Sequence, residues 1–200
     1  MMRIAMRQAR LVTIVTAMMA SAITSLTGCS TYAVSRYAVS VENVATLRTM
    51  RGQPINVGRF TAKLDDVSSI MCRGVGPIKT PDEESFAEYV RKALISELMM
   101  AEVYAATAPV TLTGTVDHAD FSSTSGSWQI GLTVVSSNGK SVSIDEQYAF
   151  TSSFFGETAC NQTAQAFMPA VQDLIKKLVS DQAFKSLVAP PESVATTPGR

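Results

Sequence analysis

The chain has 200 residues, with 17 basic and 17 acidic side chains and a single histidine, which gives a formal net charge of zero at pH 7. This length is enough for one domain with a substantial hydrophobic core. Three of the basic residues lie within the first ten positions, so the rest of the chain carries 14 basic residues against 17 acidic ones. That balance argues against a nucleic-acid partner, which requires a basic surface.

The N-terminus has the zones of an export signal. Met1–Arg10 is basic and contains no acid, and Leu11–Ser25 is apolar and uncharged. The apolar zone spans about 15 residues, which is short for a transmembrane helix of about 20. We therefore expect a secretory signal peptide over residues 1–28.

The end of this segment, Leu26-Thr27-Gly28-Cys29, resembles the lipobox of bacterial lipoproteins. The resemblance implies that the signal is cleaved before Cys29 and that lipid on this cysteine holds the protein to a membrane. Two or more acyl chains anchor stably, because each buried CH2 contributes about 0.8 kcal/mol. In such lipoproteins an aspartate after the cysteine favours the inner membrane, so Ser30 predicts the outer membrane and a protein that faces the periplasm. An ordinary signal peptide with an incidental cysteine is the alternative.

The mature chain divides into three parts. Residues 29–40 contain the tetrapeptide Tyr-Ala-Val-Ser twice and are expected to form a lipidated tether. Residues 41–188 are expected to form a single α+β domain. Residues 189–200 contain three prolines and no apolar periodicity, which is typical of a flexible tail.

The two remaining cysteines, Cys72 and Cys160, are expected to form a disulfide. An even number of cysteines in an exported chain is typical of an oxidising compartment. Cys160 also shares a helical stripe with apolar residues, which directs it toward the core. Two separate buried thiols, or a reactive Cys160 at a helix N-terminus, are the alternatives.

The domain begins with a predicted short helix over Val41–Met50, a strand over Pro54–Lys63 and a loop over Asp65–Thr80. A long helix then follows Thr80, which precedes a proline and stands three residues before Glu83, the pattern of an N-cap with a capping box.

Glu97 falls within the apolar face of this long helix. A buried carboxylate at this position could be functional. The favoured interpretation is a glutamate at the boundary of the face that reaches water or a basic partner.

Alternating apolar residues predict three strands, and a helical apolar stripe predicts a final long helix. The strands are Val110–Asp117, Trp128–Ser136 and Ser141–Thr151, and the helix spans about Ala159–Ser180. The stripe keeps its phase across Pro169, so we expect one kinked helix rather than two.

The turn between the last two strands fixes their register. A two-residue Asn138-Gly139 turn would place apolar residues opposite polar ones. A three-residue loop, with Gly139 in the left-handed conformation, pairs Val134 with Val142 instead. We predict the three-residue loop, because a one-residue slip turns every side chain to the other face.

The sequence has no catalytic or metal-binding constellation. His118 is the only histidine and is expected at a strand end, and one histidine cannot build a common zinc site when Cys72 and Cys160 are paired. The loop Ser122–Ser127 lacks the spacing and the lysine of a phosphate-binding loop. We therefore expect no enzyme, no metal and no cofactor. A hydrolase that uses His118 and a serine is the remaining catalytic alternative.

Phe154 and Phe155 follow the last strand directly. Adjacent side chains of an extended chain point to opposite sides, so one ring could be exposed as a partner surface. Packing of both rings beneath the last helix is the favoured interpretation.

The order of strand, long helix, three strands and long helix resembles small proteobacterial envelope lipoproteins of the YajG, LptE and PqiC types. The segment Gly156–Ala164 is also similar to a group of outer-membrane lipoproteins. We expect a two-layer α+β fold, with a mainly antiparallel four-stranded sheet and two long helices on one face. The resemblance favours a non-enzymatic accessory protein that binds or helps assemble a membrane or periplasmic protein partner. A binder of a small or lipid ligand, in a cleft between helices and sheet, is the alternative.

Overall fold

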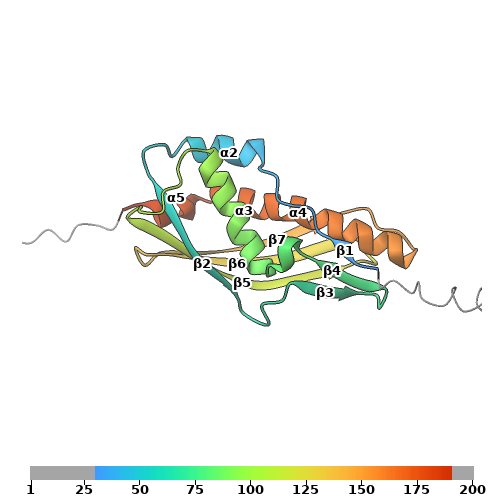
Figure 1. The fold of residues 1–200 in the computed structure, drawn as a ribbon. Helices are drawn as coiled ribbons and strands as arrows, with labels where there is room; N and C mark the ends of the chain where they lie inside the picture. The colour runs from blue at the N-terminus through green and yellow to red at the C-terminus, as the bar shows by residue number, and fades with distance from the viewer. Residues whose placement is uncertain (1–29, 191–200) are drawn as a thin grey trace, which may run out of the picture. The chain divides into compact units, whose positions relative to one another are not determined.

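The computed structural model describes residues 30–190. The predicted signal peptide, Cys29 and residues 191–200 of the predicted tail lie outside this part. Within it, four helices and two mixed sheets form an α+β fold, as predicted (Figure 1).

The larger sheet has four strands in the order β2-β5-β6-β7. β6 is antiparallel to both of its neighbours, β5 and β7. β2 runs parallel to β5, because helix α3 returns the chain across the sheet between them. The sheet is therefore mainly antiparallel, as predicted. The strands are β2 (Ile55–Ala62), β5 (Val110–Ser122), β6 (Ser127–Ser136) and β7 (Ser141–Ala149).

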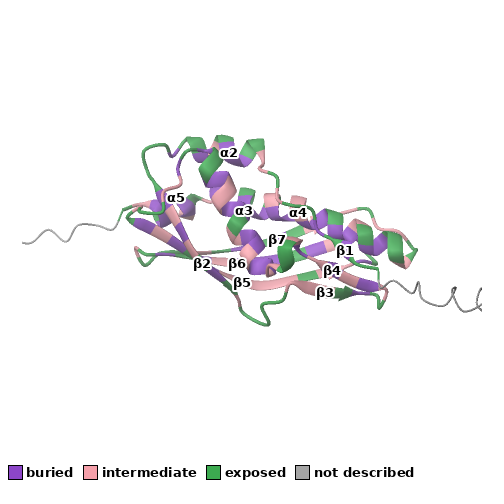
Figure 2. Ribbon diagram, in the orientation of Figure 1, coloured by how far each residue is buried: buried purple, intermediate pink, exposed green. Residues whose placement is uncertain are grey.

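Two long helices cover one face of this sheet, as the apolar stripes predict. Helix α3 (Phe86–Met100) packs on β2 and β5, and helix α4 (Gly156–Ser180) packs on β6 and β7. Figure 2 shows the buried residues of both helices on the sides that meet the sheet. The shorter helix α5 (Gln182–Val188) also packs on β6 and β7, and α2 (Val41–Arg48) packs against α3 and α4.

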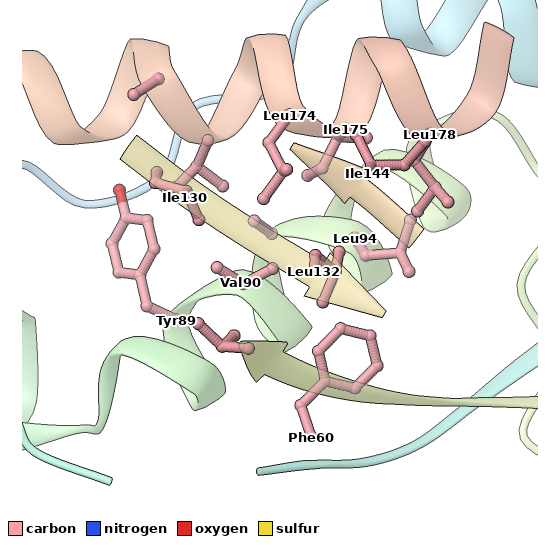
Figure 3. Packing of buried hydrophobic residues seen from close by; sticks show 14 of the residues in the cluster. Phe60, Tyr89, Val90, Leu94, Ile130, Leu132, Ile144, Leu174, Ile175 and Leu178 are labelled. Carbon is pink, nitrogen blue, oxygen red and sulfur yellow. The ribbon is translucent and has the colours of Figure 1, made fainter. Parts of the chain in front are cut away.

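The space between the two layers is filled with apolar side chains (Figure 3). Trp128 and Phe167 are fully buried, with ring centroids 4.8 Å apart, and Phe86 meets Phe167 edge to face. The indole Nε1 of Trp128 donates a hydrogen bond to the carbonyl of Thr163, 2.8 Å away. At this centre, core side chains fill the space between the helices and the sheet.

The predicted hairpin register is confirmed. Val134 lies opposite Val142, and Gly139 has a φ of 84°. Helix α4 is continuous across Pro169, which confirms one helix rather than two.

The predicted loop over 65–80 is wrong. It contains strands β3 (Ser69–Cys72) and β4 (Gly76–Lys79), which form an antiparallel hairpin. Strands of four residues are too short for their alternation to stand out from a loop that is rich in glycine. They belong to a second sheet, with the order β1-β4-β3.

The expected tether also differs from the structure. Strand β1 (Tyr32–Ala33) pairs in parallel with β4, and Val34 donates a backbone hydrogen bond to the carbonyl of Lys79. Tyr32 and Val34 are buried, because the period of two in Tyr-Ala-Val places both on the side that meets the core.

The predicted N-cap at Thr80 is wrong as well. A single 3-10 turn over Pro81–Glu83 follows Thr80, and α3 begins only at Phe86. Ser85 is the N-cap, and its hydroxyl accepts a hydrogen bond from the backbone N–H of Glu88. Ser85 and Glu88 have the capping-box spacing too, so two equivalent signals competed in this stretch.

Candidate functional site

The predicted disulfide is present between Cys72 and Cys160. Both cysteines are fully buried, and their Cα atoms lie 5.9 Å apart. The bond joins the last residue of β3 to the first turns of α4. It therefore fixes the small sheet to the helical layer, close to the connection between β7 and α4.

Phe154 and Phe155, in that connection, are both exposed. Phe154 is 93% exposed and Phe155 is 74% exposed, and their rings meet edge to face with centroids 6.2 Å apart. The favoured prediction that both pack beneath the last helix is wrong. Phe155 is the N-cap residue of α4, so its backbone is extended and the two rings leave the surface before the helical layer begins.

The backbone beneath these rings is held in place by Arg73. Its guanidinium donates to the carbonyl of Phe154 at 3.1 Å, to the hydroxyl of Ser123 at 2.8 Å and to the carbonyl of Ser123 at 2.5 Å. Arg73 follows the disulfide-bonded Cys72 directly. We call Phe154, Phe155 and Arg73 the aromatic corner. Its apolar surface is exposed although its backbone is ordered by a covalent bond and three hydrogen bonds.

A groove of about 390 Å³ lies between β3 and the second half of β5. Strand β2 accompanies β5 only as far as the pair Ala62 and Val116, after which β5 continues to Ser122 with β6 as its single neighbour. β3 pairs only with β4. The groove therefore runs between two strand edges that have no strand partner among residues 30–190.

The floor of the groove is apolar and its rim is acidic. Ile70, Phe86, Ala87, Val116 and Ala119 contribute the floor. The acids that line it are Asp65, Asp66, Asp117 and Asp120. Lysine and arginine form no salt bridge with any of the four within the described part of the chain.

Glu97 is completely buried, so the predicted boundary position is wrong. Its Oε1 accepts hydrogen bonds from the hydroxyl of Tyr37 at 2.6 Å, from the backbone N–H of Ser40 at 2.8 Å and from Nδ2 of Asn43 at 3.4 Å. Burial, together with the bond to Glu97, raises the pKa of Tyr37 above its ordinary value. This carboxylate faces the segment that follows β1 rather than an open cavity, which indicates a structural role.

His118 lies within β5 at a bulge, not at the end of the strand. Its ring covers Gly131, and its Nε2 is 3.8 Å from a carboxylate oxygen of Asp145. Within residues 30–190 no serine hydroxyl is hydrogen-bonded to His118, so the geometry gives no support to the hydrolase alternative.

Metal-ligand clusters and membrane-spanning helices are not found among the described residues. No three His, Cys, Asp or Glu side chains come together there as metal ligands. None of the helices between residues 30 and 190 is both long and apolar enough to cross a membrane.

The groove is the feature that the sequence did not reveal. Its position depends on where β2 leaves β5, and that position is set by tertiary packing. The predicted strand ends at Asp117, where the clear alternation ends, whereas β5 continues to Ser122. The sequence therefore contains only a weak signal for the strand edge that lines the groove.

No model of a known protein family matches the chain, and no curated protein matches it. The crystal structure of protein XCC0632 from Xanthomonas campestris, described as DUF330, is similar to 75% of this chain and covers 95% of its own length. The sequence identity is 14% and the TM-score is 0.47.

Proposed function

We propose that the protein is a lipid-anchored, non-enzymatic accessory protein of the bacterial envelope, which binds or helps assemble a membrane or periplasmic protein. The exposed pair Phe154 and Phe155 carries this proposal. Large aromatic side chains are enriched at protein interfaces and are costly to leave in water. The order imposed by Arg73 and the nearby disulfide supports a binding surface, because a preorganised contact loses little entropy on association.

Photo-crosslinking tests this surface directly. A photoreactive phenylalanine analogue replaces Phe155 in cells, and the same analogue at Val135, which is 42% exposed on β6, is the control. We expect one dominant protein adduct from position 155 and none from position 135. Adding Phe154→Ser should reduce the adduct at least five-fold. Equal adducts at both positions, or none at 155, would contradict the proposal.

Metabolic labelling tests the anchor. The lipobox predicts that Cys29→Ala abolishes palmitate labelling and leaves the longer precursor, whereas Cys72→Ala leaves the label unchanged. Continued labelling and cleavage of the Cys29 variant would show that the proposed anchor is wrong.

Membrane fractionation tests the location. We expect the labelled protein in the outer-membrane fraction, and a shift to the inner-membrane fraction for Ser30→Asp but not for Ser30→Ala. An unchanged distribution for Ser30→Asp would remove the support for an outer-membrane destination.

A further inference from the structure

The second half of β5 presents an unpaired strand edge in the described structure. Lys63 makes the last backbone hydrogen bond across this side of the strand, to the carbonyl of Val116. From Asp117 to Ser122, β5 pairs only with β6. At about 3.3 Å per residue this edge is about 20 Å long. Edges of this kind are templates for an added strand, and proteins commonly cover or charge them.

A second edge faces the first across the groove. Figure 1 shows β3 beside the far half of β5, and residues of both strands line the same hollow. Arg73 follows β3 and Ser123 follows β5, and the hydrogen bonds between these two residues join the chain just beyond the ends of the two strands. The loop that contains Leu64 and Asp65 also lines the groove.

The side chains of the groove define what can fill it. The floor is apolar, and Leu64 and Met71 extend this surface outward, with exposures of 79% and 61%. An extended segment places alternate side chains on opposite faces. Apolar residues at every second position would therefore be buried against Phe86 and Ala119, while the residues between them would face the rim.

The charge of the rim determines which residues of a bound extended segment can face it. Asp65, Asp66, Asp117 and Asp120 line the groove without a lysine or arginine partner within residues 30–190. Four carboxylates around one groove, three of them exposed, repel acidic segments and attract basic ones.

We propose that this groove binds an extended segment of a partner protein, which adds as a strand between β3 and β5 and alternates apolar with basic residues. Strand addition obtains affinity from backbone hydrogen bonds and specificity from alternate side chains. The inference deepens the proposed function and rests on it, since it names a second surface and the chemistry of its partner. The cross-link at Phe155 and the binding in this groove can fail separately, because they use different residues.

Peptide binding to the purified full chain tests the proposal. The probe is a fluorescent eight-residue peptide that alternates valine and lysine, measured by anisotropy. A valine–glutamate peptide and a valine–lysine peptide with N-methylated alternate amides are the matched probes. We expect the basic peptide to bind at least ten-fold more tightly than either control. Equal binding of the N-methylated peptide would overturn strand addition, and equal binding of the acidic peptide would overturn charge selection.

Variants of the rim locate the site. The double variant Asp65→Asn, Asp66→Asn should weaken binding of the valine–lysine peptide about five-fold and make its affinity less dependent on salt. Asp173→Asn on α4 should change neither the affinity nor its salt dependence. These substitutions are at exposed positions and do not disturb the core. No effect of the double variant would place the peptide elsewhere.

Hydrogen exchange provides an independent readout. Bound peptide should slow the exchange of amides within Asp117–Ser122 and leave the outer edge of β7 unchanged. Protection of β7 instead, or of neither edge, would overturn the proposal. If palmitate binds in the groove more tightly than the valine–lysine peptide, and β5 is not protected, the groove is a site for a small apolar ligand. That result would also overturn the proposal of strand addition.

Discussion

Glu97 shows how a single buried carboxylate can organise the start of a domain. It receives one hydrogen bond each from Tyr37, Ser40 and Asn43, and has no cationic partner among the described residues. A buried charge is costly unless donors replace the lost water. Three donors from one segment therefore tie residues 37–43 to α3. Gln172 adds a bond from α4 to the carbonyl of Ala38, 2.7 Å away.

The first prediction concerns the hydroxyl of Tyr37. Tyr37→Phe removes a donor from a buried carboxylate, so we expect a loss of about 1–3 kcal/mol in the free energy of unfolding. Tyr32→Phe is the matched control, because the Tyr32 hydroxyl is buried without a partner and its removal should cost less than about 0.5 kcal/mol. Urea unfolding of both variants measures the difference. Equal losses would mean that Tyr37 does not support Glu97.

The second prediction concerns stability at high pH. Burial is the main cause that raises the pKa values of Tyr37 and Tyr89 in the folded chain, with smaller effects of Glu97 and Glu84 respectively. An unfolded tyrosine loses its proton near pH 10, while these two retain theirs. Their contribution to stability is thus complete below about pH 10 and is lost as the pH rises above it.

Urea titrations between pH 9 and 11.5 measure this effect. Above pH 10 the free energy of unfolding should fall less steeply with pH for Tyr37→Phe than for the unchanged protein. The difference between the two slopes should approach about 1.4 kcal/mol per pH unit. Identical slopes for the unchanged protein and Tyr37→Phe would show that the Tyr37 phenol ionises normally.

At the scale of elements, close approaches between strands and side chains set the register. Phe60 lies over Gly114 of the neighbouring β5, so a Cβ atom at Gly114 would be 2.6 Å from the Phe60 ring. The ring is 3% exposed and has no solvent into which it could turn (Figure 3). The bulge between Val57 and Phe60 brings the ring to this position.

The third prediction follows from that contact. Gly114→Ala should destabilise the protein by about 1–3 kcal/mol, because the added methyl group overpacks a closed core. Gly58→Ala adds the same group on the other face of β2, where the methyl groups of Thr111 and Thr113 are the nearest atoms, at 3.2 and 3.1 Å. These side chains can move, so we expect a change within about 0.5 kcal/mol for the control. Thermal or urea unfolding distinguishes the pair, and equal effects would contradict the packing argument.

At the scale of the whole molecule, the disulfide joins segments that are 88 residues apart in the sequence. It closes a loop that includes α3 and the strands β5, β6 and β7. Chain entropy is therefore removed from most of the unfolded domain. The same bond fixes β3, and with it one wall of the groove and the base of the aromatic corner.

The fourth prediction is the stability that this bond supplies. For a loop of this length the chain-entropy model gives about 4–5 kcal/mol, which is an upper figure because residual structure in the unfolded state reduces it. Cys72→Ala with Cys160→Ala should lower the free energy of unfolding by up to this amount, and reduction of the unchanged protein should have a similar effect. Thiol counting in unfolded, unreduced protein provides the control. Two free thiols from these positions would rule the bond out.

The sequence by itself determined the features that depend on local pattern. Alternation and helical stripes predicted the four-stranded sheet and the two long helices, because burial of one face imposes a period on each element. The hairpin register followed from Val134 and Val142, since only one loop length places apolar residues opposite each other. The disulfide followed from the parity of cysteines in an exported chain. The lipobox likewise needs no tertiary context, and lipid on Cys29 stays a prediction.

Only the tertiary structure decided the features that depend on contacts between distant segments. The burial of Glu97 depends on Tyr37 and Asn43, which meet it from a segment that was expected to be partly a tether. Thr80 and Ser85 both have the capping-box spacing, and only the structure shows that Asp82 and Glu83 have positive φ and that α3 begins after Ser85. The groove exists because β2 leaves β5 after Val116, and no local pattern encodes where two strands separate. Local sequence fixes the period of each element, whereas the surfaces available to a partner depend on how those elements meet.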